Sequence, residues 1–104
     1  MTRLAALQQF LKQDPNDSFT RYAIGLEYAK EKNFAEAIRT LEELRSLDAN
    51  YIPTYYMLGS YYRELGQNEQ AGLVYRDGIA KARAARDLHA ASELDAALDE
   101  LESE

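Results

Sequence analysis

The chain of 104 residues has the length of a single domain, and its apolar fraction of 46% is ordinary for a globular protein. It has no cysteine, which excludes disulfides and thiol chemistry, and no apolar run approaches the ~18 residues of a membrane span. The net charge of −6 opposes binding to nucleic-acid phosphates. Because its first residues also lack a secretory apolar segment, the sequence predicts a soluble, cytoplasmic protein.

Six helices are predicted, because good helix formers dominate and only two prolines interrupt them. The expected helices cover about residues 3–13, 18–30, 34–47, 52–65, 68–84 and 87–102. Polar caps are expected at Thr2, Asn33 and Asp87, and a left-handed stop is expected at Gly66. The expected apolar face of the last helix consists of Leu88, Ala91, Leu94, Leu98 and Leu101. Short turns between the helices favour antiparallel neighbours.

An internal repeat of 34 residues organises the middle of the chain. Ile24-Gly25 recurs as Leu58-Gly59, and Tyr28 recurs as Tyr62. A repeat of this length indicates helical hairpins that stack on one another. Such stacks form curved surfaces, which hold other chains more often than they carry out chemistry.

The repeated glycines fall in the middle of helices, where glycine costs about 1 kcal/mol relative to alanine. Their recurrence at one interval predicts that another helix passes too close for a side chain at each of them. Small residues on the second helix of each hairpin, Ala37 and Ala71, are the expected facing partners of Gly25 and Gly59.

In these residues the chain resembles the tetratricopeptide repeat family. The second unit carries the motif as Tyr55, Leu58-Gly59, Tyr62, Gly66, Ala71, Tyr75 and Gly78. The first unit carries Ile24-Gly25, Tyr28, Ala37, Leu41 and a closing 47–50 segment, although Arg21 stands where the family prefers an aromatic residue. The resemblance implies an all-α, right-handed solenoid in one domain over residues 1–104. Its expected parts are a half-repeat (2–17), two repeats (18–51 and 52–86) and a capping helix (87–104).

The resemblance also implies a binding surface, because the first helix of each pair lines the concave face in this family. The expected groove residues are Phe19, Tyr22, Leu26 and Lys30 from the first unit, and Pro53, Tyr56, Ser60 and Arg63 from the second. Tyr22 and Tyr56 are 34 residues apart and are expected to stack along the groove floor. Tyrosine rings beside Lys30 and Arg63 are typical of peptide contacts, and packing between neighbouring helices is the alternative role for the tyrosines.

The expected function is a non-catalytic protein–protein interaction module that binds a peptide or partner segment in this groove. The alternative is homo-oligomerisation or scaffolding through the terminal helices, with Leu4, Leu7 and Phe10 packing on a second copy. The family's carboxylate-clamp subgroup has Lys and Asn where this chain has Tyr22 and Leu26, so no such clamp is expected.

The sequence offers few candidate residues for a catalytic or metal-binding site. The single histidine, His89, is expected to be solvated, and one histidine without cysteine cannot supply the usual zinc ligands. Carboxylates are spread over expected surface positions, and no Gly-rich phosphate loop is present. The sequence therefore predicts no enzyme, no catalytic residues, no metal and no cofactor.

Overall fold

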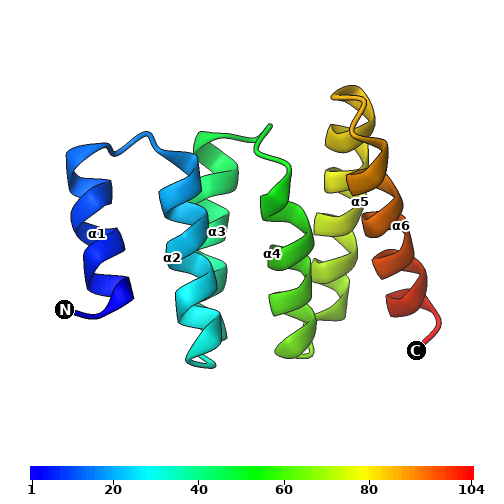
Figure 1. Cartoon of the computed structure of the whole chain (residues 1–104). Helices are drawn as coiled ribbons and strands as arrows, with labels where there is room; N and C mark the ends of the chain where they lie inside the picture. Colours follow the sequence, from blue (N-terminus) through cyan, green and yellow to red (C-terminus); the bar gives the residue numbers. More distant parts are fainter.

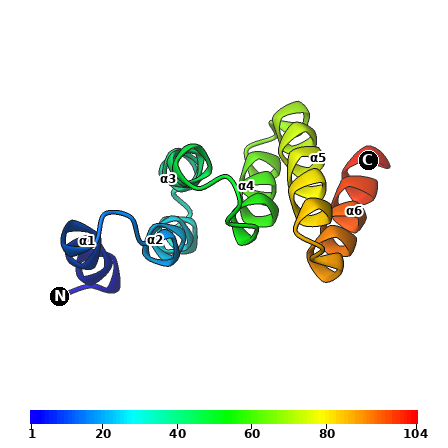
Figure 2. The ribbon, with the colours of Figure 1, turned by 90° about the horizontal axis from the view of Figure 1, so that it is seen from above.

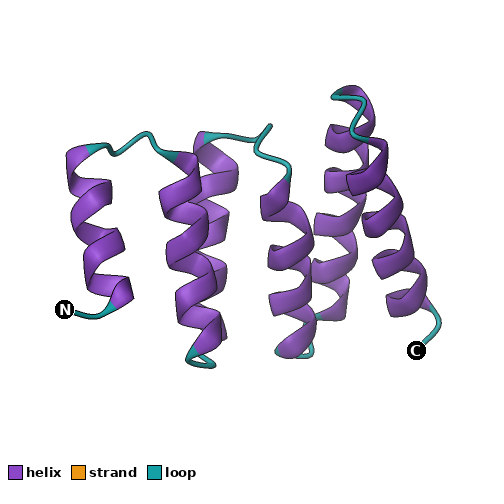
Figure 3. Cartoon of the chain, viewed as in Figure 1, coloured by secondary structure: helices purple, strands orange, loops and turns teal.

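The computed structural model describes all 104 residues and contains six helices joined by short turns, without strands (Figures 1 and 3). The helices are α1 (Arg3–Gln13), α2 (Ser18–Lys30), α3 (Phe34–Leu47), α4 (Pro53–Glu64), α5 (Asn68–Ala84) and α6 (Leu88–Glu102). All six helices match the expected ranges to within a residue at each end. The fourth is a residue shorter at each end, because Pro53 occupies its first turn and Leu65 caps it.

The predicted caps are confirmed. The side chains of Thr2, Asn33 and Asp87 each accept a hydrogen bond from the backbone N–H three residues on, at 3.0, 3.3 and 3.1 Å. Gly66 ends the turn after α4 with φ of 75°. Lys32, at the equivalent point one repeat earlier, adopts φ of 63° without being glycine. The repeat therefore extends to backbone conformation where the residue types differ.

The helices form a curved stack in which α3 and α5 lie behind α2, α4 and α6 (Figures 1 and 2). Successive helices pack in antiparallel pairs, and additional contacts join α2 to α4 and α4 to α6. One face of the stack is therefore built from α2, α4 and α6. No helix combines the length and the apolar content that crossing a bilayer requires.

The mid-helical glycines lie at close helix contacts, but their partners are not the predicted alanines. A Cβ at Gly25 would lie 2.6 Å from Cδ2 of Leu41, and the nearest atom of Ala37 is its carbonyl oxygen at 3.7 Å. A Cβ at Gly59 would overlap the ring of Tyr75. Each glycine thus packs against a large side chain of the following helix. The alanine one turn before that side chain, Ala37 or Ala71, allows the two helices to come close together.

The core runs from α3 to α6. Its fully buried large side chains include Leu41, Leu44, Tyr55, Leu58, Tyr75 and Leu94. Helix α6 packs through Ala91, Leu94, Ala97 and Leu101, whereas the predicted contact of Leu88 is wrong, since 74% of this residue is exposed. Leu88 is the first residue of α6, so it precedes the turn that packs on α5. Helix α1 has no fully buried residue.

A polar network ties the two hairpins together on the face away from α2 and α6. Arg45 of α3 donates to Asp77 of α5 at 2.9 Å and to Glu42 at 3.1 Å, and its guanidinium lies 5.9 Å from the ring centre of Tyr55. The hydroxyl of Tyr62 donates to Glu42. These contacts bridge α3, α4 and α5 and fix the stacking of one hairpin on the next.

We expect this fold to be sensitive to alkali. Burial raises the pKa of Tyr61 and Tyr62 to about 12, and the carboxylate of Glu42 adds to the rise at Tyr62. A tyrosine has a pKa of about 10 in the unfolded chain. When its pKa is higher in the folded state, its contribution to the free energy of unfolding is fully present below pH ~10. That contribution is lost as the pH rises from about 10 through 12.

Tyrosinate absorbance at 295 nm, followed together with far-ultraviolet circular dichroism, measures this effect. The expected result is late ionisation that coincides with loss of helix, and a higher alkaline midpoint in a Tyr62→Phe variant. Full ionisation near pH 10 with the helices intact would contradict the assignment.

Candidate functional site

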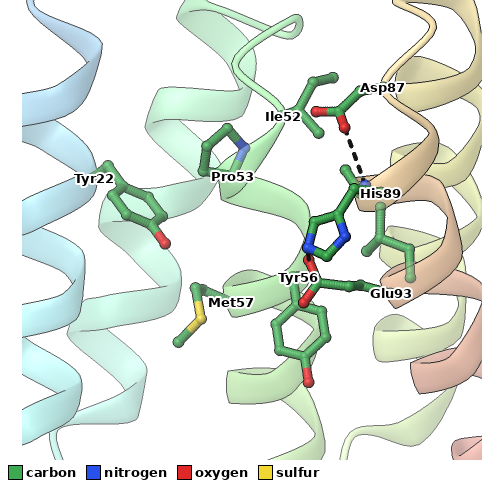
Figure 4. A pocket seen from close by; sticks show the side chains of 10 residues that line it. Tyr22, Ile52, Pro53, Tyr56, Met57, Asp87, His89 and Glu93 are labelled. Carbon is green, nitrogen blue, oxygen red and sulfur yellow. Dashed lines mark hydrogen bonds and ion pairs between the residues drawn. The ribbon is translucent and has the colours of Figure 1, made fainter.

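A groove runs between α4 and α6 on the face that these helices share with α2. One part of the groove is a pocket of about 300 Å³ (Figure 4). The α2 and α4 side consists of Tyr22, Ile52, Pro53, Tyr56 and Met57. The α6 side consists of Asp87, His89, Ala90, Glu93 and Leu94. We call this the first pocket; its walls are mainly apolar and its α6 rim is acidic.

The two tyrosines of the first pocket are held by different neighbours. Tyr22 is half-buried, with its ring centre 5.8 Å from that of Tyr51, and Tyr56 is 43% exposed, with its ring centre 6.4 Å from that of buried Tyr75. The predicted stacking of Tyr22 on Tyr56 is therefore wrong, although both rings line the same pocket. Burial and the neighbouring Tyr51 raise the pKa of Tyr22 above its ordinary value.

Towards the C-terminal end of α4, the groove continues into a second pocket. It is lined by Tyr56, Ser60, Arg63, Tyr75, Glu93, Ala96, Ala97 and Glu100. Arg63 forms ion pairs across it with Glu100 at 3.1 Å and with Glu104 at 2.9 Å. These carboxylates, Glu104 most of all, raise the pKa of Arg63. The guanidinium of Arg63, which was predicted to contact a peptide, is thus paired with two carboxylates of this chain.

The predicted groove residues divide into two sets. All four predicted residues of α4 line one or both pockets, together with Tyr22 of α2: Pro53, Tyr56, Ser60 and Arg63. Phe19, Leu26 and Lys30 line neither pocket. Phe19 is 61% exposed and Lys30 is exposed at the C-terminal end of α2. The two pockets are therefore formed mainly by α4 and α6, and Tyr22 is the one residue of α2 that lines them.

The contribution of α6 to the groove was not predicted. Residues 87–104 were expected only to form a capping helix, whereas Ala90, Glu93 and Leu94 form one wall of the first pocket. The 34-residue spacing gave no signal for these positions, because residues 87–104 fit the repeat only after a shift of about two residues. His89, for example, is 86% exposed, whereas Tyr55, 34 residues earlier, is fully buried.

The groove's chemistry suits binding of side chains. His89 and Glu93 approach each other to 3.4 Å, but His89 is 86% exposed and no nucleophile adjoins it. No group of three or more His, Cys, Asp and Glu side chains has an arrangement that could hold a metal ion. Amphipathic rings, an apolar cavity and nearby carboxylates can instead hold a segment of another chain.

The comparisons with known proteins agree with this geometry. A family model described as tetratricopeptide repeat matches residues 20–51 and 52–80. The solution structure of a tetratricopeptide repeat domain protein from Salinibacter ruber is 39% identical, with 86% of this chain and 91% of that chain covered and a TM-score of 0.82. Among curated proteins, no significant match is found.

Two more distant structures share the fold. Protein BPP2914 from Bordetella parapertussis is 23% identical, with 99% of this chain and 90% of that chain covered and a TM-score of 0.86. PcrH, solved in complex with the chaperone binding region of PopD, is 16% identical, with 96% and 76% covered and a TM-score of 0.88. At these identities the likeness concerns the arrangement of helices alone.

Proposed function

The chain belongs to the tetratricopeptide repeat family, and we propose that it is a non-catalytic module that takes a peptide or partner segment into the groove between α4 and α6. The observation that carries the proposal is the first pocket, an apolar cavity with Tyr56 43% exposed on its wall. An aromatic ring beside an apolar cavity is a typical anchor point for a partner side chain.

Two further observations support the proposal. The face made by α2, α4 and α6 is concave, and a groove between helices is a common place for peptides to bind. PcrH, which has the same fold, was solved with a segment of another protein, PopD. The family is generally a non-catalytic interaction fold, and the groove contains no evident catalytic constellation.

A Tyr56→Ala variant tests the proposal. Tyr56 contributes an exposed ring to the groove, so its removal should lower partner capture at least tenfold while the melting temperature changes by only a few degrees. Partner recovery from the native cell, compared between wild type and variant, measures the first effect, and circular dichroism measures the second. Equal recovery of every captured protein by the two forms would overturn the proposal.

The exposed apolar surface of α1 supports a second function, self-association. Phe10 is 61% exposed, and Leu4 and Leu7 are only half-buried. Packing of α1 on a second copy would bury this surface and extend the stack. Light scattering at several concentrations tests it: a dimer that a Phe10→Ser substitution abolishes is the expected result. A monomer at all concentrations would exclude it.

A further inference from the structure

The charge of the groove narrows the class of segment that it can hold. Four carboxylates belong to its α6 side: Asp87, Glu93 and Glu100 line the pockets, and Glu104 bonds to Arg63. Arg63 is the single Lys or Arg side chain that lines either pocket. These four carboxylates and Arg63 of α4 together give the groove a net charge of −3.

Arg63 does not make the groove attractive to acidic segments, because its guanidinium is engaged by Glu100 and Glu104. Glu93 differs from these two carboxylates. It lines both pockets, its side chain is 56% exposed, and the one side chain that pairs with it is His89, at 3.4 Å. A carboxylate placed between two cavities without a Lys or Arg partner is available to a cation on an incoming segment.

From these features we infer the occupant of the groove: a segment that seats a large apolar side chain in the first pocket and sets a Lys or Arg against Glu93. The inference rests on the proposed function and adds the chemistry of the partner. The first pocket supplies apolar contact through Ile52, Met57 and Leu94, and Glu93 supplies the charge complementarity.

The length of the groove sets the spacing of these two features. Pro53 and Arg63, at its two ends on α4, are ten residues apart, which is about 15 Å along a helix. An extended segment rises about 3.3 Å per residue, so about five residues cover the groove. Glu93 lies between the two pockets, so the basic residue is expected within about three positions of the apolar anchor.

A random dodecapeptide library displayed on phage, selected on the wild-type protein, tests the inference. Bound phage are then compared on wild type and on Tyr56→Ala. The expected result is enrichment of peptides with Lys or Arg within three positions of a large apolar residue, and loss of their binding to the variant. Peptides that need Tyr56 but are acidic or uncharged would overturn the inference and leave the proposed function standing. Peptides indifferent to Tyr56, or no enrichment, would overturn both.

The affinity of a Glu93→Gln variant for a selected peptide measures the contribution of Glu93. Asp99→Asn is the matched control. Asp99 lies on the same helix and is exposed, but it lines neither pocket. An enriched basic peptide, synthesised with a fluorophore, should bind Glu93→Gln roughly two- to fivefold more weakly than wild type and bind Asp99→Asn unchanged. Equal weakening by both substitutions would show that only the net charge of the protein matters and would overturn the assignment of Glu93.

Discussion

Gly78→Ala should destabilise the protein by about 2 kcal/mol, although alanine favours helix. A Cβ at Gly78 of α5 would lie 2.5 Å from Cβ of Tyr55 and 3.1 Å from Cδ1 of Leu94. The Cβ of Tyr55 is attached directly to the backbone of α4, so no rotamer change can relieve the overlap. Helices α4 and α5 must move apart, and that movement outweighs the gain of about 1 kcal/mol in helix propensity.

Gly72→Ala is the matched control, since it makes the same substitution in the same helix. Its added Cβ would meet only the flexible end of Arg76 at 3.3 Å and Cδ2 of Leu101 at 3.8 Å. This variant should therefore gain stability, by up to about 1 kcal/mol. Urea denaturation of both variants measures the free energies of unfolding. A stabilised Gly78→Ala, or two variants with the same sign, would contradict the close packing of α4 on α5.

Tyr55→Ala should produce the largest loss of stability of any substitution considered, about 4 kcal/mol. The side chain of Tyr55 is fully buried, its ring lies under the guanidinium of Arg45, and its hydroxyl donates to the carbonyl of Ala49. Truncation opens a cavity at the junction of both hairpins and leaves that carbonyl unpaired. Thermal unfolding should shift down by roughly 20 °C.

A Tyr55→Phe variant separates the ring from the hydroxyl. It keeps the packing and removes one hydrogen bond, so the expected loss is about 1 kcal/mol. Tyr56→Ala, one residue further along α4, should leave the melting temperature within a few degrees because that ring is 43% exposed. Similar melting temperatures for Tyr55→Ala and Tyr56→Ala would mean that the inner and outer faces of α4 are assigned wrongly.

The fold could be predicted because its determinants are local. Helix starts depend on a single polar side chain, as at Asn33, and the 34-residue repeat places equivalent contacts without knowledge of the rest of the chain. The facing partners of Gly25 and Gly59 could not be predicted correctly. The choice between Ala37 and Leu41 depends on the crossing of two helices, and spacing along the sequence does not specify that crossing.

The groove was predictable only in part, because contacts between helices are not specified by spacing along the sequence. Periodicity placed Tyr22 and Tyr56 on one face, but it did not show that Arg63 is engaged by the last turns of α6. Ion pairs between helices depend on tertiary distance and have no signature in either helix alone. The acidic rim at Glu93 was missed because residues 87–104 carry the repeat pattern weakly, with Glu93 itself standing at the place of Gly59.

Chemical-shift mapping on the ¹⁵N-labelled protein tests most directly whether the face of α2, α4 and α6 is the binding surface. The protein is titrated with a synthetic peptide taken from the library selection, and the amide shifts are followed residue by residue. We expect the largest changes around Tyr22, Tyr56 and Ala90, which line the first pocket. Changes confined to α1, or to the opposite face around Arg45 and Asp77, would contradict a binding groove between α4 and α6.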